Sequence, residues 1–277
     1  MLDEFILSVL KEDIGDGDHT SLSCISEQEK GSAQLEVRQE GVIAGIDVAK
    51  RIYEIYDSTL SMEIIKKDGD SVHKGDVGFI LTGSAQSILT TERVVLNIMQ
   101  RMSGIATKTR NLVNQISHTN AELLDTRKTT PGIRFLEKKA VLIGGGSNHR
   151  FGLFDMIMIK DNHVDFSGGI QQAITKTKEY LKKQNKCLKI EVEVRSIDEL
   201  NQVLRVGGVD RIMLDNFSPA EISRALKLIP TEYETEASGG ITEANIVDYA
   251  ETGIKYISVG ALTHSVVSLD LSLKASF

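Results

Sequence analysis

LKIEVEVRSIDELNQVLRVGGVDRIMLDN, residues 188–216, is the segment that decides the fold. Its two ends, LKIEVEV (188–194) and VDRIMLDN (209–216), are short apolar runs that finish in charged or polar residues. The stretch between them has the spacing of apolar residues that is typical of a helix. A strand, a helix and a second strand in this order indicate a parallel sheet with covering helices.

The same pattern recurs on both sides of this segment, at AELLDTRK (121–128), FDMIMIKDN (154–162), YETEASGG (233–240) and YISVGA (256–261). A complete eight-stranded barrel needs about 250 residues, and only about 160 are available here for six strand candidates. We therefore expect an incomplete, open α/β barrel. A doubly wound sheet is the competing fold, but no GxGxxG follows the first strand to support it.

The N-terminal residues have a different pattern. SAQLEVRQEGVIAG (32–45) and DGDSVHKGDVGFILTG (68–83) alternate like strands joined by Gly turns, and residues 46–56 have helical spacing. A helix is predicted over Thr91–Met102, with Thr90 or Thr91 as its N-cap. We predict an N-terminal α+β domain over 1–103, the barrel over 104–266, and a tail over 267–277 that packs back on the first domain.

Composition excludes several classes of protein. The net charge of −7 and the pI of about 5.5 argue against nucleic-acid binding. Cys24 and Cys187 form no CxxC, which disfavours a disulfide scaffold or structural zinc. The start, MLDEFILSVLKED, is a poor signal peptide, and no apolar segment is long enough to span a bilayer. A cytoplasmic location without membrane contact is the expectation.

A cluster of basic residues lies between Asp125 and Lys160 in this acidic chain, formed by Arg127, Lys128, His149, Arg150 and Lys160. Arg grips carboxylates and phosphates at two points and Lys adds a compact charge, so a small anionic ligand is expected. If the alternating faces of the strands point inward, Arg127, Lys160, Glu193 and Asp215 meet at one mouth of the barrel. The alternative is that these charges form ordinary ion pairs at the barrel rim. A regular barrel would put the loop of His149 and Arg150 at the opposite end, so either IGGGS (143–147) lets it fold over the mouth or these residues are not catalytic.

Two further groups of residues suit a phosphorylated substrate. The last two strand candidates end in small residues, namely Ser238, Gly239, Gly240, Gly260 and Ala261. In phosphate-binding barrels this is where backbone N–H groups approach a phosphate. Glu193 and Asp215 suit Mg²⁺, although they could equally neutralise Lys160. Arg93, in the predicted first helical turn, opposes the helix dipole, unless an anion from a partner subunit meets it.

Motifs along nearly the whole chain resemble those of the quinolinate phosphoribosyltransferase family, the carboxylate-releasing nicotinate-nucleotide pyrophosphorylases. The motifs are EDIGDGDHTS (12–21), TERVVLN (91–97), MSGIAT (102–107), DTRKTTPG (125–132), GGGSNHR (144–150), IKDNH (159–163), EVEV (191–194), LDN (214–216), SGGI (238–241) and VGALTHS (259–265). The resemblance implies an N-terminal α/β sandwich, an open α/β barrel, and a homodimer whose sites are completed by the neighbouring subunit. The role of EDIGDGDHTS stays open, with packing favoured.

The resemblance also implies the site. Arg93 would reach in from the partner subunit. The basic residues Arg127, Lys128, His149, Arg150 and Lys160 would bind quinolinate and part of phosphoribosyl pyrophosphate. Glu193 and Asp215 would lie near ribose and Mg²⁺. The small residues Ser238, Gly239, Gly240, Gly260 and Ala261 would bind phosphate, and Lys128, Lys160, Glu193 and Asp215 would be catalytic.

The implied reaction belongs to NAD biosynthesis and yields nicotinate mononucleotide, pyrophosphate and CO2. Three alternatives remain open at this stage. A Schiff-base aldolase would use Lys160 as the nucleophile. A glycosidase would use Glu191 and Glu193. A non-catalytic anion-binding protein would bind its ligand without turnover.

Overall fold

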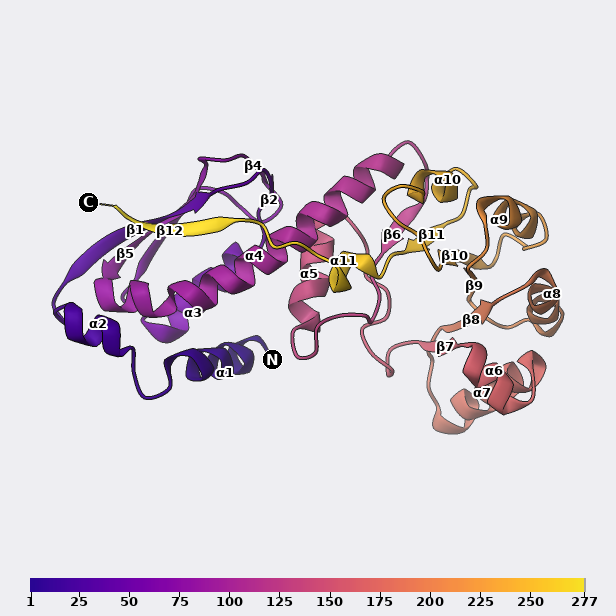
Figure 1. The fold of residues 1–277 in the computed structure, drawn as a ribbon. Helices are drawn as coiled ribbons and strands as arrows, with labels where there is room; N and C mark the ends of the chain where they lie inside the picture. Colours follow the sequence, from indigo (N-terminus) through magenta and orange to yellow (C-terminus); the bar gives the residue numbers. More distant parts are fainter. Residues whose placement is uncertain (277) are drawn as a thin grey trace. The chain divides into compact units, whose positions relative to one another are not determined.

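A computed structural model describes residues 1–276, and the chain forms two compact units (Figure 1). The first unit comprises residues 1–110, 135–145 and 266–277, and the second comprises 111–134 and 146–265. The domain limits expected from the sequence, 1–103 and 104–266, stay a prediction. Phe277, the last residue of the expected tail, lies outside the described residues. No helix in residues 1–276 has the length and apolarity needed to cross a membrane.

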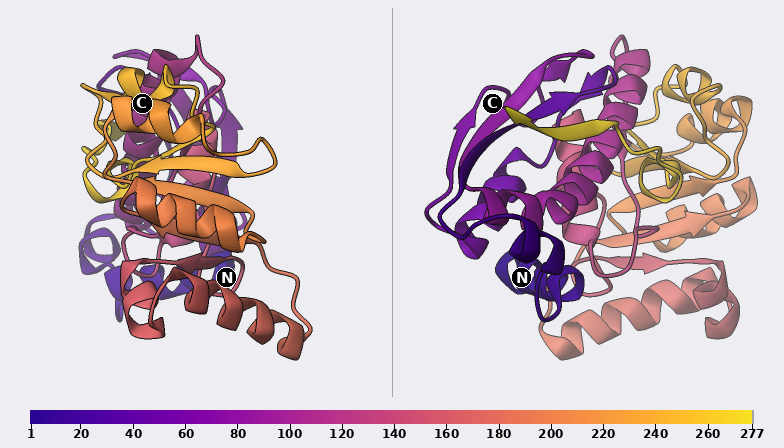
Figure 2. Two further views of the ribbon diagram at one scale, coloured as in Figure 1. Left: turned by 90° about the vertical axis from the view of Figure 1, so that its right-hand side faces the viewer. Right: turned by 60° about the vertical axis from the view of Figure 1, so that its left-hand side comes forward.

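The first unit is built on a four-stranded antiparallel sheet with the order β12-β1-β5-β3. Its elements are α1 (Leu2–Ile14), α2 (His19–Cys24), β1 (Lys30–Val37), β2 (Gly41–Val42), α3 (Ile46–Tyr56), β3 (Ser61–Ile64), β4 (Ser71–Val72), β5 (Val77–Ser84), most of α4 (Ala85–Ile116), nearly all of α5 (Arg134–Gly144) and β12 (Leu271–Ser276). Strand β12, from the end of the chain, pairs with β1 from Leu271↔Val37 to Ser276↔Ser32 (Figures 1 and 2). The last strand therefore completes the first sheet.

Alternating apolar residues explain this sheet. Leu35 and Val37 on β1 and Phe79 and Leu81 on β5 are fully buried, while the alternating residues Gln34, Glu36 and Ile80 are partly exposed. The ring of Tyr53, on α3, meets the ring of Phe79 edge to face, with their centroids 6.0 Å apart. The apolar face of α3 thus covers the sheet and forms the core of the unit.

The helix predicted over Thr91–Met102 is longer than expected. Helix α4 runs over Ala85–Ile116, so Thr91 lies inside it and is not its N-cap. The hydroxyl of Thr91 donates to the carbonyl of Ser87 at 2.7 Å, a bond that the helix interior permits. Arg93 is therefore beyond the first turn, and the expected conflict with the helix dipole does not arise.

The second unit contains a six-stranded parallel sheet with the order β6-β11-β10-β9-β8-β7. Its elements are β6 (Glu122–Leu124), β7 (Ile157–Ile159), α6 (Asp161–Ser167), α7 (Ile170–Gln184), β8 (Ile190–Val194), α8 (Ile197–Val206), β9 (Arg211–Asp215), α9 (Pro219–Leu226), β10 (Glu234–Ser238), α10 (Ile246–Ala250), β11 (Tyr256–Ser258) and α11 (Ala261–His264). Every predicted barrel strand is present, and α7, α8 and α9 lie along one side of the sheet (Figures 1 and 2). The predicted open α/β barrel is confirmed.

The segment after α5 enters this sheet, which the sequence did not predict. Ser147 forms a parallel bridge with Leu124, and its N–H donates to the carbonyl of Leu123 at 2.8 Å. One residue further on, the N–H of Asp125 donates to the carbonyl of Ser147 at 3.2 Å. Because Ser147 runs beside β6 in the same direction, His149 and Arg150 emerge at the carboxyl end of the strands. The expected conflict over the position of this loop is thereby resolved.

Candidate active site

The carboxyl ends of the barrel strands surround a cavity of about 820 Å³. Its lining residues are Thr126, Arg127, Lys128, His149, Arg150, Met158, Lys160, Glu193, Met213, Asp215, Asn216, Glu236, Ser238, Gly239, Gly240, Ile241, Thr242, Ser258, Gly260, Ala261 and His264. This set contains every predicted site residue of the second unit. Arg93 lies in the first unit, on α4, and is exposed.

Two guanidinium groups give one side of the cavity a positive charge. Arg150 is held by its Nη1, which donates to the carbonyl of Met156 at 3.2 Å, and by a contact of 3.7 Å from Nη2 to Sδ of Met158. Burial and then the positive charge of Arg127 lower the pKa of Arg150. Among residues 1–276, the Nε of Arg127 is buried without a hydrogen-bond partner. This side of the cavity therefore presents donors and positive charge to an anion.

The carboxyl ends of β7, β8 and β9 carry Lys160 and the predicted acidic residues. Lys160, at the end of β7, donates from Nζ to Oε2 of Glu193 at 2.6 Å, so these two groups form an ion pair. Burial and then the charge of Glu193 raise the pKa of Asp215. Asn216, in the left-handed region at φ 57°, donates from its side chain to Asp215 Oδ2 at 2.6 Å. Asn216 thus fixes the orientation of this carboxylate.

Backbone turns close a third side. Gly239 and Gly240 follow β10 with φ of 94° and 62°, a region that favours glycine. A Cβ on Gly239 would overlap Oδ1 of Asn216, so the turn and the LDN segment fit together only without a side chain. Gly260 leaves room for Lys128, whose Cδ would lie 3.0 Å from a Cβ at that position. These small residues let the backbone border the cavity directly.

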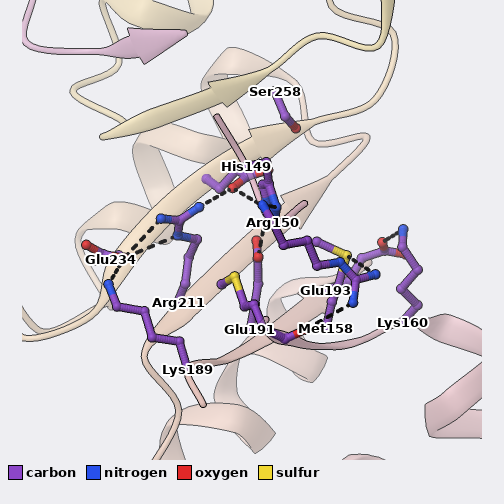
Figure 3. A network of polar contacts seen from close by, with 12 residues as sticks. His149, Arg150, Met158, Lys160, Lys189, Glu191, Glu193, Arg211, Glu234 and Ser258 are labelled. Carbon is purple, nitrogen blue, oxygen red and sulfur yellow. Dashed lines mark hydrogen bonds and ion pairs between the residues drawn. The ribbon is translucent and has the colours of Figure 1, made fainter. Parts of the chain in front are cut away.

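His149 lies at the base of the cavity, above a buried group of charges (Figure 3). Its Nε2 is 2.9 Å from Oε2 of Glu191 and 3.3 Å from Oε2 of Glu236, and the side chains of both glutamates are fully buried. Glu236 is also paired with Nη1 of Arg211 at 2.9 Å. The backbone N–H of Arg150 donates to Nδ1 of His149 at 2.6 Å. Both ring nitrogens are therefore engaged by the protein.

The protonation of this group follows from those contacts. Burial alone would lower the pKa of His149, but its hydrogen bonds to Glu191 and Glu236 raise it to about 9. The backbone N–H of Arg150 donates to Nδ1, so the proton on Nε2 faces the two carboxylates. Burial and then the charge of Glu236 raise the pKa of Glu191.

Sequence reasoning did not single out Asn216 and Glu236, which line the cavity, or Arg211, which lies beneath it against Glu236. Alternation along YETEAS is consistent with Glu234 and Glu236 on one face of the strand, but alternation does not show how deeply each side chain is buried. The strand carries Glu236 into the interior and leaves Glu234 partly exposed.

The geometry also weighs against two alternative functions. Glu191 is fully buried and does not line the cavity, so Glu191 and Glu193 cannot act as the two carboxylates of a glycosidase. A lysine nucleophile must spend time neutral, and Lys160 would have to give up its ion pair with Glu193 to do so.

Two family models match the chain. The model described as "Quinolinate phosphoribosyl transferase, N-terminal domain" matches residues 18–103. The model described as "Quinolinate phosphoribosyl transferase, C-terminal domain" matches residues 105–274.

Individual relatives cover almost the whole chain. The "Probable nicotinate-nucleotide pyrophosphorylase [carboxylating]" of Bacillus subtilis (strain 168) is 45% identical over 273 residues, which are 99% of this chain and 91% of the relative. The crystal structure of NadC from Streptococcus pyogenes has a TM-score of 0.94 and 37% identity, covering 99% of this chain and 96% of the other. The nicotinate-nucleotide pyrophosphorylase from Francisella tularensis has a TM-score of 0.92 and 40% identity, with the same coverage.

Proposed function

The chain belongs to the quinolinate phosphoribosyl transferase family, and from this premise we propose that it transfers the phosphoribosyl group of phosphoribosyl pyrophosphate to quinolinate. The transfer is coupled to loss of CO2 and gives nicotinate mononucleotide and pyrophosphate. The protein therefore takes part in NAD biosynthesis.

One observation carries this proposal: Arg127 and Arg150 border one cavity as neighbouring cations, and the Nε of Arg127 is buried without a partner. Two guanidinium groups this close repel each other and stabilise the protein only when an anion lies between them. Quinolinate has two adjacent carboxylates, and each of the two neighbouring guanidinium groups can donate two hydrogen bonds to one of them. Lys128, at the same side of the cavity, adds a third positive charge for the dicarboxylate or the phosphates.

The acidic side of the cavity suits the ribose and Mg²⁺. Glu193 and Asp215 are oxygen donors close enough for the charge of Glu193 to raise the pKa of Asp215, and a divalent cation would relieve that repulsion. These two carboxylates would hold Mg²⁺ together with substrate oxygens. When bound, Mg²⁺ neutralises developing charge on the pyrophosphate that leaves. Lys160 keeps Glu193 in place through their ion pair.

The phosphates lie against the small residues that end β10 and β11. Ser238, Gly239 and Gly240 form one turn, and Gly260 and Ala261 form the next. Since neither Gly239 nor Gly240 has a side chain, phosphate oxygens can approach the backbone N–H groups closely. The 5′-phosphate of the sugar therefore binds at these turns.

The chain's own residues act by placement and charge. The pyridine nitrogen of quinolinate attacks C1 of the ribose while the C–O bond to pyrophosphate breaks, and the sugar carbon passes through an oxocarbenium-like state. The carboxylates of Glu193 and Asp215 face this positive charge, and the basic residues Lys128 and Lys160 face the departing pyrophosphate. The positive charge of the pyridinium nitrogen then stabilises the electron pair left on the adjacent ring carbon as its bond to the carboxylate breaks and CO2 leaves, and a proton from solvent takes the place of the carboxylate. No covalent intermediate with the protein is needed.

The protein acts as a homodimer in the cytoplasm. Arg93 lies in the first unit, where it is exposed on α4. We assign it to the site of the partner subunit, where its guanidinium meets an anionic substrate.

The first experiment follows release of labelled CO2 from carboxyl-labelled quinolinate. Release is expected only when both phosphoribosyl pyrophosphate and Mg²⁺ are present, with pyrophosphate formed in equal amount. Tight binding of quinolinate without any release, in the presence of both, would identify an anion-binding protein and overturn the proposal.

Replacing Arg127 tests the observation that carries the proposal. Arg127→Ala removes up to two charge-assisted hydrogen bonds of about 1.5–3 kcal/mol each, so kcat/KM for quinolinate should fall by roughly a hundredfold or more. Arg205→Ala, on the outer helix α8, is the matched control and should retain activity. Circular dichroism and thermal unfolding establish that both variants fold. Unchanged turnover in Arg127→Ala would remove Arg127 from the site.

A further inference from the structure

A chain of ion pairs runs from the exposed amino end of the barrel strands to the base of the cavity (Figure 3). At the outer end, Glu234 Oε2 lies 3.3 Å from Nζ of Lys189 and 3.1 Å from Nη2 of Arg211. Nη1 of Arg211 then contacts Oε2 of Glu236 at 2.9 Å, and the same oxygen lies 3.3 Å from Nε2 of His149. Glu191 provides the second buried carboxylate, 2.9 Å from that nitrogen. The buried part, formed by Glu191, Glu236, Arg211 and His149, is here called the floor cluster.

The floor cluster fixes His149 from both edges of its ring. Nε2 points to Glu191 and Glu236, and Nδ1 accepts from the backbone N–H of Arg150. The backbone N–H of His149 donates to Oδ1 of Asp125 at 2.8 Å, which ties the same segment to the end of β6. Neither ring nitrogen is left to bind quinolinate. The ring therefore contributes to the site by fixing the backbone of the next residue in the chain.

That neighbour is Arg150. Its backbone is set by the Nδ1 of His149, and its guanidinium by the carbonyl of Met156 and the sulfur of Met158. A bidentate grip on a carboxylate tolerates little displacement, because two donors must meet two oxygens at once. Any rotation of the His149 ring would shift the backbone from which Arg150 projects.

We propose that Glu191 and Glu236 are positioning residues for quinolinate binding, which hold the His149 ring so that its Nδ1 orients Arg150 toward a carboxylate of the substrate. This inference rests on the proposed function and assigns roles to two residues that do not react. His149 becomes a positioning residue as well, where the sequence motif implied a ligand of quinolinate.

A metal ion would be the other occupant for a histidine beside two carboxylates. The candidate ligand atoms of His149, Glu191 and Glu236 all lie within 4.8 Å of one another. The guanidinium of Arg211, however, already supplies a cation next to Glu236, and the contacts with both carboxylates raise the pKa of His149. Side chains of the protein therefore supply positive charge beside the two buried carboxylates.

The test compares two substitutions of Glu191 in the full-length protein. Glu191→Met keeps much of the volume but removes the acceptor, while Glu191→Gln keeps an oxygen that accepts from Nε2–H. In Glu191→Met, KM for quinolinate should rise about tenfold or more, whereas KM for phosphoribosyl pyrophosphate should change less than about twofold. Glu191→Gln should restore KM for quinolinate to within about threefold of the wild type.

Glu234→Met is the matched control. Glu234 contacts Arg211 at the outer end of the same chain of ion pairs, but it does not touch His149 or line the cavity. Both KM values should stay within about twofold of the wild type in this variant, because the contact to Glu236 is kept. Equal increases of the two KM values in Glu191→Met, or a Glu191→Gln variant as impaired as Glu191→Met, would overturn the proposal.

A readout independent of turnover separates this inference from the proposed function. In protein labelled with ¹⁵N-histidine, Nε2–H of His149 should give a slowly exchanging, downfield proton signal, identified by its absence in His149→Gln. Glu191→Met should lose this signal if Glu191 holds the ring, and retention of the signal would overturn the proposal even if the variant is inactive. Failure of the wild type to release CO2 would contradict the proposed function instead.

Discussion

At the scale of single residues, the cavity depends on positions where a side chain cannot fit. Gly239 has a φ of 94°, and a Cβ at this position would overlap Oδ1 of Asn216. Asn216 in turn donates from its side chain to Asp215, and its backbone N–H donates to the carbonyl of Ser238 at 2.8 Å. One glycine therefore controls both the phosphate turn and the orientation of an acidic residue.

Substituting Gly239 should consequently affect activity more than stability. Gly239→Ala should lower stability by about 1–2 kcal/mol through backbone strain, and displacement of Asn216 should raise KM for phosphoribosyl pyrophosphate at least about tenfold. Gly253→Ala is the control, because Gly253 has a φ of 87° but open space around its Cβ direction. It should show a similar loss in urea unfolding with activity retained. Equal activities of the two variants would contradict a role for the Asn216 contact.

At the scale of secondary-structure elements, the sequence predicted the second unit well. The six barrel strands of the second unit, like helix α3 of the first unit, lie where apolar periodicity and turn residues placed them, because each is a local pattern. Three features depend on partners distant in sequence and could not be predicted. The bridge of Ser147 to Leu124 needs α5 to return the chain beside β6. The early start of α4 follows no local signal at Thr91.

The third feature is the floor cluster. The spacing of IEVEV shows that Glu191 and Glu193 share a face, yet Glu191 is fully buried while Glu193 borders the cavity. The difference comes from depth within a curved sheet, which periodicity does not encode. For the same reason the sequence identified the residues at the mouth and missed Glu236 below it.

Strand β12 should be essential for the first unit. Leu271 and Leu273 are 3% and 8% exposed, and their strand pairs with β1. Leu271→Ala and Leu273→Ala should each lower the free energy of unfolding by about 2–5 kcal/mol, while exposed Lys274→Ala should change it by less than about 0.5 kcal/mol. Hydrogen exchange of the β1 amides should accelerate in the two leucine variants. Unaltered protection of β1 would show that β12 contributes little to this sheet.

At the scale of the whole molecule, the assignment of Arg93 to a partner's site can be tested by mixing subunits. Arg93→Ala and Lys160→Ala homodimers should each be inactive. Heterodimers formed by refolding an equal mixture contain one intact site, so the mixture should recover about a quarter of wild-type turnover. Heterodimers demonstrated by mass spectrometry without recovered activity would argue against sharing between subunits.

The pairing of β12 with β1 also bears on how the protein is made. Leu271 leaves the ribosome 234 residues after its partner Val37, a delay of roughly 10–50 s at ordinary rates of elongation. During that interval β1 has an unpaired edge, a site at which nascent chains aggregate. The sheet of the first unit is thus completed only after the rest of the chain has been translated. Its assembly should therefore be sensitive to chaperones that shield β-strand edges.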